Sequence, residues 1–427
     1  MTHAPYDYRA DGPLPTVKQH SVAKHEVLRT YLVEYLQTLV GSPGQEELRV
    51  TLVDGYAGAG RYRHETTGAD VFGSPLVMLQ AAKEAEFLIN QGRLKPLRMN
   101  IDYFFVELDK DAFKLLGRTL DEQGFNGRVG ADIQLFNSRF EDQVDGIRDF
   151  IAKKSPRSGR SIFVLDQYGY SKIPASQIRA ILKALPSSEV ILTFAVDSFI
   201  NYASDFDQTG RLLQQIGIPD VLKGRTIEDI KSKEADFRLY IQSCLYPELV
   251  AACGARYYTL FFIRTDGHGD YWLVHLSQHP RARDVMTQVH WKKNNHFIHY
   301  GGPGIDMFQA LGYSAALDDQ YMGQATGQPS LGFCFDNLAA EASAKTLMEQ
   351  LPHIVYAHPE GISFGELFAT TCNTSPADTG KYKEAIARLI SQKDIQVISP
   401  EGNQRQKAST IGDKDQLIPS SQSTFGF

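Results

Sequence analysis

The sequence predicts an α/β fold in which helices cover both faces of a parallel sheet, followed by a small winged helix-turn-helix unit. Two observations carry this prediction. Strand-like apolar runs alternate with helical patterns from residue 20 to residue 246, and such alternation requires parallel strands joined by crossover helices. After residue 337, three helical patterns precede a short strand and a turn, which is the order of elements in a winged helix-turn-helix.

The strands of the sheet are short apolar runs, each bounded by polar or glycine-rich segments. We expect them at 49–54, 101–106, 132–136, 161–165 and 189–196. Helices are expected at 20–39, from Ser74 onward, at 109–123, up to 150, at 178–185 and at 226–246, with Ser74 as a cap and Pro75 in the first turn. Runs at 256–264 and 271–276 flank a glycine-bearing turn, which predicts a hairpin that adds an antiparallel strand at the edge of the sheet.

Changes in composition divide the chain. We predict a flexible arm at 1–20, an α/β domain at 21–296, a linker or lid at 297–336, the winged unit at 337–415 and a disordered tail at 416–427. The linker is rich in Gly, Pro, Asp and Gln and has no clear periodicity. Within the winged unit we expect helices at 338–352, 363–370 and 376–392, a strand at 395–399 and a second strand at 404–411.

The composition limits the class of protein. No apolar run approaches the roughly 18 residues of a membrane span, and the N-terminal residues lack the apolar core of a secretory signal. We therefore expect a cytoplasmic protein. The four cysteines form no C-x-x-C pair, which argues against a zinc site or a disulfide framework. A net charge of −6 excludes an overall basic surface but allows a local basic patch for nucleic acid.

The most informative stretch is the strand at 49–54 with the glycines that follow it. An uncharged aliphatic run ends at Asp54, and Gly55, Gly58 and Gly60 then fall within six positions. Glycine allows a positive φ angle and lets a ligand approach main-chain N–H groups. The pattern predicts a ligand-binding loop, although glycines after a strand also form plain turns.

Four expected strands end in a polar residue: Asp54, Glu107, Asn137 and Asp166. Ligands of open parallel sheets bind beyond the carboxyl ends of the strands, at the switch in strand order. Glu107 is placed to accept hydrogen bonds from ribose hydroxyls, and Asn137 or Asp142 could contact an adenine edge. Together with the loop, these residues predict a pocket for an adenosine-containing cofactor. A solvated strand end fits Glu107 nearly as well as a ribose contact does, and for Asn137 a structural role is favoured over a ligand contact.

The loop differs from the G-x-G-x-x-G of dinucleotide folds, because an acidic residue precedes it and a polar segment separates it from the helix. Asp54–Gly60 resembles the first motif of S-adenosylmethionine-dependent methyltransferases, and Phe105–Asp109 resembles their ribose-binding second motif. The resemblance implies a Rossmann-like class I methyltransferase sheet, whose last strand is antiparallel. It implies S-adenosylmethionine rather than a nicotinamide as cofactor, held by Asp54, Gly55, Tyr56, Ala57, Gly58, Gly60, Glu107, Leu108 and Asn137.

The chain more closely resembles the three-Cys-motif partner (TcmP) family over residues 18–295. The matching motifs are Lys24–Leu28, Asp54–Gly60, Gly73–Leu76, Phe105–Glu107, Asp166-x-Tyr168-Gly169, and Met286 with Trp291. The resemblance implies a methyltransferase-like protein with a radical-S-adenosylmethionine-like three-Cys-motif partner, encoded in mobile-element or phage-defence gene sets. The C-terminal unit resembles the winged domains attached to some members. One departure is Gln167, where members of the family tend to have proline.

The turn after the fourth strand is the expected catalytic segment. In amino-methylating enzymes, an Asp or Asn accepts a hydrogen bond from the target amine and an aromatic ring stacks on the flipped base. Asp166 and Tyr168 are candidates for these roles. Gln167 lacks the rigidity of proline, which weakens the inference of amine methylation.

Candidate residues for substrate or nucleic-acid binding are Lys24, Ser74, Lys292, Lys293 and Arg405. Lys24 lies on the helix before the glycine loop, although such a lysine is by default solvent-exposed. For the basic residues Arg281, Arg283, Lys292 and Lys293, a solvated face is favoured over a row of phosphate contacts. In the winged unit, Lys381, Lys383, Arg388, Lys393, Arg405 and Lys407 could face DNA, but Asp378, Glu384 and Asp394 oppose this, and winged units also dock proteins. The histidines 64, 275, 279 and 290 show no metal spacing, so we expect no metal.

The favoured function is an S-adenosylmethionine-dependent methyltransferase acting on nucleic acid or on a partner-bound substrate. The alternative is a catalytically inactive adaptor or nucleic-acid-binding subunit that keeps the methyltransferase fold, which Gln167 favours mildly. A hydrolase or nuclease would need a metal cluster that the sequence does not suggest.

Overall fold

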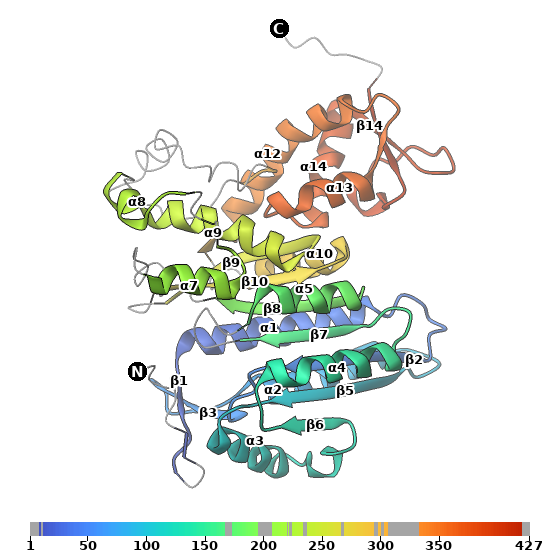
Figure 1. Cartoon of the computed structure of the whole chain (residues 1–427). Helices are drawn as coiled ribbons and strands as arrows, with labels where there is room; N and C mark the ends of the chain where they lie inside the picture. Colours follow the sequence, from blue (N-terminus) through green and yellow to red (C-terminus); the bar gives the residue numbers. More distant parts are fainter. Residues whose placement is uncertain are drawn as a thin grey trace. The chain divides into compact units, whose positions relative to one another are not determined.

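The computed structural model describes residues 8–9, 12–166, 173–194, 207–219, 221, 224–233, 237–265, 269–293, 298–299, 303–305 and 333–420. The chain forms two units, Met1–Val285 and Met286–Phe427. Tyr168 and Gln167 of the expected catalytic turn, and most of the expected linker or lid, lie outside the described residues. Figure 1 shows the chain coloured along its sequence.

The first unit contributes seven strands to the main sheet, in the order β9-β10-β8-β7-β2-β5-β6. The strands are β2 (Glu47–Asp54), β5 (Arg98–Val106), β6 (Ile133–Phe136), β7 (Ser161–Leu165), β8 (Ser188–Phe194), β9 (Tyr257–Thr265) and β10 (Gly269–Ser277). β2, β5, β6, β7 and β8 are parallel, whereas β10 is antiparallel to both β8 and β9. This arrangement confirms the predicted Rossmann-like methyltransferase sheet with an antiparallel edge hairpin.

The helices of this unit precede, connect and follow the strands of the sheet. They are α1 (Gln19–Thr38), α2 (Ser74–Asn90), α3 (Lys110–Glu122), α4 (Phe140–Lys154), α5 (Ala175–Ala184), α7 (Asp207–Ile216), α8 (Ile227–Lys233) and α9 (Phe237–Cys253), followed by α10 (Pro280–Lys292). α1 packs on α2, and α5 packs on α9. In Figure 1, α4 and α5 lie in front of the sheet and α1 lies behind it. The strands between these layers bury Leu52, Val53, Phe105 and Phe163 completely.

The connections place the switch in strand order at β2. From β2 the chain passes to β5 and β6 on one side, and it later returns to β7 on the other side of β2. The carboxyl ends of β2 and β7 are therefore neighbours at the switch point, where open α/β sheets bind ligands. Asp54 is the last residue of β2, and Asp166 directly follows β7.

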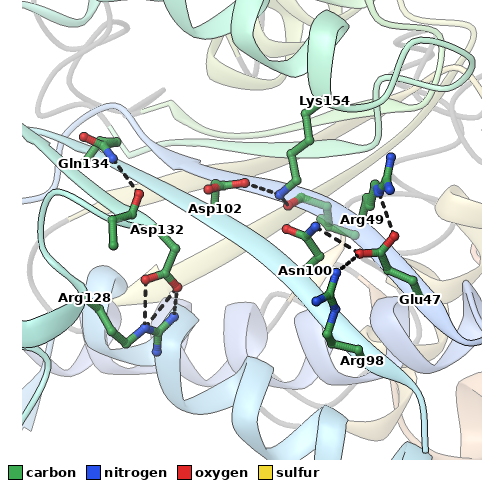
Figure 2. A network of polar contacts seen from close by, with 11 residues as sticks. Glu47, Arg49, Arg98, Asn100, Asp102, Arg128, Asp132, Gln134 and Lys154 are labelled. Atoms are coloured by element: carbon green, nitrogen blue, oxygen red, sulfur yellow. Dashed lines mark hydrogen bonds and ion pairs between the residues drawn. The ribbon is translucent and has the colours of Figure 1, made fainter.

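Polar contacts fix the opposite, amino-terminal edge of the sheet, as Figure 2 shows. Lys154, the last residue of α4, forms an ion pair with Asp102 and donates a hydrogen bond to the Val50 carbonyl at 2.8 Å. The Glu47 carboxylate accepts hydrogen bonds from Arg49, Arg98 and Asn100. These contacts tie the beginnings of β2 and β5 to the end of α4, so the polar residues at this edge are engaged in holding the sheet together.

A second, smaller sheet adjoins the glycine loop. It has the order β1-β3-β4, formed by β1 (Thr16–Val17), β3 (Arg61–His64) and β4 (Asp70–Phe72). β1 comes from the segment that we expected to be a flexible arm, and it pairs in parallel with β3. Val17, Ala59, Tyr62 and Leu115 form a buried cluster there, with Tyr8 packed against it.

The second unit contains α12 (Asn337–Tyr356), β13 (Ile362–Ser363), α13 (Phe364–Thr371), α14 (Thr379–Gln392), β14 (Ile395–Ile398) and β15 (Gln416–Pro419). The three strands pair in the order β13-β15-β14. Side chains of Asp336, Ser363 and Asp378 cap the three helices. This order confirms the predicted winged helix-turn-helix. Two further short strands, β11 (Ile298–His299) and β12 (Phe333–Cys334), pair with each other.

Several local predictions were wrong. Gly73, not Ser74, is the N-cap of α2. The second wing strand is Gln416–Pro419, within the expected tail, because a 3-10 turn at Ala408–Thr410 lengthens the wing. The expected helix at 226–246 is instead described as α8 and α9. Helix α10 was not foreseen, since its buried face carries charged residues such as Arg283, which is 2% exposed rather than part of a solvated face.

Candidate functional site

Asp54 lies at the centre of the carboxyl edge of the sheet and is completely buried. Its Oδ1 atom accepts a hydrogen bond from the Tyr56 N–H at 3.1 Å, whereas Oδ2 has no partner among the described residues. Burial raises the pKa of Asp54 from 3.8 to about 7, although hydrogen bonds from the buried Ser74 and from Tyr56 act in the opposite direction. Asp166 and Glu107 also raise this pKa, so the three carboxyl groups are electrostatic neighbours.

From the sequence we expected the N–H groups of the glycine loop to be free for a ligand. In the structure they are bonded within the protein. Gly55 N–H donates to the Val164 carbonyl and Ala57 N–H to the Val106 carbonyl, both at 3.0 Å. Gly58 N–H donates to the Glu107 carboxylate at 2.7 Å. Ala59 N–H donates to the Tyr62 hydroxyl at 3.1 Å. A ligand that used the Gly58 N–H would have to displace Glu107.

The loop needs glycine for reasons of conformation and space. Gly58 and Gly60 have φ angles of +61° and +70°, a region that favours glycine. A Cβ at Gly58 would lie 2.0 Å from the Tyr62 hydroxyl, and one at Gly60 would lie 2.7 Å from a methyl group of Leu116. The space beside these glycines is therefore filled by side chains of the protein itself. Tyr56 is half-buried, and burial together with nearby Glu141 raises its pKa.

Glu107 connects the loop to the end of β5. Besides the bond to Gly58, its Oε1 atom accepts a hydrogen bond from the Asp109 N–H at 2.8 Å. Asn137 donates from its side-chain amide to the carbonyls of Glu107, at 2.9 Å, and Leu108, at 3.1 Å. The Leu108 side chain is 58% exposed. Asn137 thus holds the segment after β5 in place, and Leu108 offers an apolar surface beside it.

Asp166 forms a two-point ion pair with Lys24 of α1. The Lys24 ammonium donates to Oδ1 at 2.7 Å and to Oδ2 at 2.5 Å. Burial alone would raise the pKa of Asp166, but Lys24 and a hydrogen bond from Thr193 outweigh it and hold the pKa below its usual value. The Lys24 side chain is 11% exposed, so the default expectation of a solvated lysine is wrong. The neighbouring His25 is half-buried with its Nδ1 atom buried, and burial followed by the Lys24 charge lowers its pKa to about 4.

The remaining candidates do not join this group of residues. Lys292 and Lys293 belong to the second unit, at the end of α10. Arg405 lies in the wing, where its guanidinium Nε donates to Asp415 at 2.9 Å. Lys381 is paired with Asp378 and Arg388 with Glu341. Three of the six expected DNA-facing cations are thus already engaged in ion pairs within the winged unit.

A buried polar triad that the sequence did not reveal anchors α1 to the sheet. Tyr31 of α1 donates to the Glu189 carboxylate of β8, and Nε2 of His275, on β10, lies 2.8 Å from the same carboxylate oxygen. All three side chains are buried. Burial and the Glu189 charge raise the pKa of Tyr31. The triad fixes the helix that carries Lys24.

The part of the chain that the structure describes offers neither a cluster of metal ligands nor a membrane-spanning helix. In that part of the chain, no group of three or more His, Cys, Asp and Glu side chains is arranged to hold a metal ion. None of the helices described combines the length and the apolar character needed to cross a bilayer.

Comparison with known proteins identifies one domain. A family model for the GMT-like wHTH domain matches residues 312–402. This match supports the winged helix-turn-helix of the second unit. No curated protein matches the sequence.

The chain is similar to solved structures at low identity over about three fifths of its length. They include the Legionella pneumophila protein LPL1258 (10% identity, TM-score 0.32, 61% of this chain and 89% of that chain) and the bifunctional kinase-methyltransferase WbdD (10%, 0.29, 60% and 39%). A third is a Methanococcus maripaludis protein described as an S-adenosyl-L-methionine-dependent methyltransferase (9%, 0.25, 60% and 91%). This chain spans about two fifths of WbdD. The strand order itself defines the fold.

Proposed function

We propose that the first unit is an S-adenosylmethionine-dependent methyltransferase that acts on nucleic acid or on a partner-bound substrate. One observation carries the proposal. In a methyltransferase-type strand order, Glu107, Asp54 and Asp166 lie at the carboxyl ends of the adjacent strands β5, β2 and β7, respectively. Ligands of such sheets bind at this edge. The sequence motifs around the same three residues resemble those of the methyltransferases.

The residues present fit an adenosyl cofactor. Oδ2 of Asp54 is a buried atom without a partner among the described residues, and such atoms favour a ligand that completes the hydrogen bond. Glu107 would exchange its bond to the Gly58 N–H for bonds to ribose hydroxyls. We assign the cofactor site to Asp54, Gly55, Tyr56, Ala57, Gly58, Gly60, Glu107, Leu108 and Asn137. The bound cofactor would supply the methyl group as an electrophile.

The chain's own contribution would be positioning. Asp166 is held as a carboxylate by Lys24, so it can accept a hydrogen bond from an amine of the acceptor. Lys24 would fix the carboxylate in one orientation, and Ser74 would do the same for Asp54. We assign Tyr168 to stacking on the acceptor, in line with the sequence motif.

The second candidate is an adaptor that keeps the fold without turnover. The internal bonding of the loop N–H groups and the pairing of Asp166 with Lys24 favour it, since both leave the edge satisfied without a ligand. Association with a three-Cys-motif radical-S-adenosylmethionine-like partner, and a place in a mobile-element or phage-defence gene set, are proposals that rest on the sequence resemblance.

The winged unit would recognise DNA or dock a protein. Residues 333–420 carry eight lysines and arginines against eleven aspartates and glutamates, so binding to DNA would depend on local cations rather than on an overall positive field. Lys292, Lys293 and Arg405 are the proposed nucleic-acid contacts. The charge balance favours protein docking as the second possibility for this unit.

Calorimetry with S-adenosylmethionine and with S-adenosylhomocysteine tests the proposal. Binding that is weakened at least tenfold by Asp54→Ala and by Glu107→Ala would support the cofactor site. Asp166→Ala should spare binding but abolish methyl transfer, measured with labelled donor on DNA, RNA and co-expressed proteins. Arg49→Ala, at the opposite edge, is the matched control and should change neither quantity. Absence of binding by the wild-type protein would refute the enzyme and leave the adaptor.

A further inference from the structure

A polar groove in the winged unit includes Arg405, one of the proposed nucleic-acid contacts, but none of the residues of the proposed cofactor site. It has a volume of about 410 Å³ and is lined by residues from the end of α14, from β14 and from the segment 404–406 that runs beside β14. Arg405 N–H donates to the Val397 carbonyl at 2.8 Å, which holds that segment on the free edge of β14. All lining residues lie between 390 and 420, within the second unit.

The lining combines an apolar floor with a polar rim. Ile390 is half-buried and contributes the apolar floor, whereas Ile395 and Val397, which also border the groove, are buried. Gln396, Gln404 and Gln406 place three side-chain amides at the rim. Among the described residues, these amides have no hydrogen-bond partner. An amide carries donors and an acceptor in one plane, which matches the flat polar edge of a nucleobase.

Two cations lie in the same groove, and no acidic side chain lines it. Arg405 directs Nε and Nη2 to Asp415, which leaves Nη1 without a partner among the described residues. Within the same part of the chain, the Lys393 ammonium has no ion-pair partner. The groove is therefore a local cationic site in a unit whose described residues are acidic overall.

Lys393 also has an unusual backbone. Its φ of +63° makes it the one described non-glycine residue in the left-handed region. It ends α14 in a position where glycine or asparagine is preferred. A lysine there costs backbone strain, and residues that persist under such strain cluster at binding sites. Lys393 thus combines a strained backbone with an ammonium group that has no ion-pair partner among the described residues, and it lines the groove.

We propose that this groove binds a nucleotide, with the phosphate at Lys393 and Arg405 and the base against the glutamine amides and the apolar floor. The shared chemistry is a 5′-phosphate joined to a flat heteroaromatic base. It can come from a free mononucleotide or from the end of a nucleic-acid strand. The site is separate from the cofactor site of the proposed function and does not depend on it.

The test measures binding to the full-length protein by calorimetry and by saturation-transfer NMR. The probes are AMP, GMP, CMP and UMP, the corresponding nucleosides, and single-stranded oligonucleotides with and without a 5′-phosphate. Mononucleotides that bind more tightly than nucleosides identify a free nucleotide as the ligand. Binding by the 5′-phosphorylated oligonucleotides alone identifies a strand end. No binding of either kind at millimolar concentration overturns the proposal, as does preference for a phosphopeptide.

Variants separate binding from folding. Lys393→Gly should weaken binding at least tenfold without lowering the thermal midpoint, because glycine tolerates this φ angle. The double change Gln404→Ala and Gln406→Ala should also weaken binding while the lysine is kept. Lys407→Ala removes the same charge from an exposed wing position outside the groove and should bind as the wild type does. Unchanged affinity in Lys393→Gly would overturn the proposal.

Discussion

Replacing Asp54 with asparagine should stabilise the protein at pH 8 and leave its stability near pH 4 almost unchanged. The pKa of the buried carboxyl rises from 3.8 to about 7 in the folded protein. The folded state therefore binds this proton more tightly than the unfolded state does. The resulting contribution to stability is complete below pH 4 and is lost as the pH rises through 7. A shift of about 3 units corresponds to roughly 4 kcal/mol of unfolding free energy lost by pH 8.

Asparagine carries no charge at any of these pH values. Its Oδ1 atom can still accept the Tyr56 N–H, so the local geometry is kept. Urea unfolding of both proteins at pH 4, 6 and 8 gives the difference in unfolding free energy. This difference should grow from near zero to a gain of up to about 4 kcal/mol for Asp54→Asn. A difference that does not vary with pH, or a loss of stability at pH 8, would refute the reasoning. A matching loss of donor affinity would show that the unfavourable burial of this carboxylate is retained for binding.

Three further predictions concern stability. Asp166→Asn should destabilise the protein at pH 8 but not at low pH, because Lys24 holds the folded pKa of Asp166 below its usual value. This effect is opposite in sign to that of Asp54→Asn, and the same urea series measures the change in unfolding free energy. Lys154→Met should lower the free energy of unfolding in urea by about 1–3 kcal/mol, because it leaves Asp102 and the Val50 carbonyl without their partner. The exposed Arg49→Met should lower it by under about 1 kcal/mol, and equal effects would contradict the prediction. Gly58→Ala should lower the thermal midpoint much more than Gly68→Ala. Both glycines have similar positive φ angles, but an added Cβ would clash with Tyr62 only at Gly58. Similar midpoints for the two variants would exclude the clash.

The fold was predictable because its signal is local. Each parallel strand is a short apolar run, and the polar residues at strand ends, such as Asp54 and Glu107, are adjacent in sequence to those runs. The glycines likewise mark the loop directly. These features need no knowledge of distant partners, so the sheet, the winged unit and the order of the site residues could be inferred.

The contacts of the site could not be predicted in the same way. Lys24 and Asp166 are 142 positions apart, and nothing in either neighbourhood indicates the other. Tyr62, which bonds to the loop, lies on a strand in a segment that looks polar and irregular. Helix α10 was missed because Arg283 and Asp284 interrupt its apolar face while being buried. In each case a tertiary partner, rather than local periodicity, decides the structure.

The parallel pairing of β1 with β3 has a practical consequence for anyone who trims the protein. Val17 is 1% exposed and packs in the same cluster as Tyr62, whose hydroxyl accepts the Ala59 N–H. Shortening the chain to begin at residue 19, where α1 starts, would remove β1 and with it Val17 from the buried cluster that supports the glycine loop. A protein shortened in this way would have an altered glycine loop.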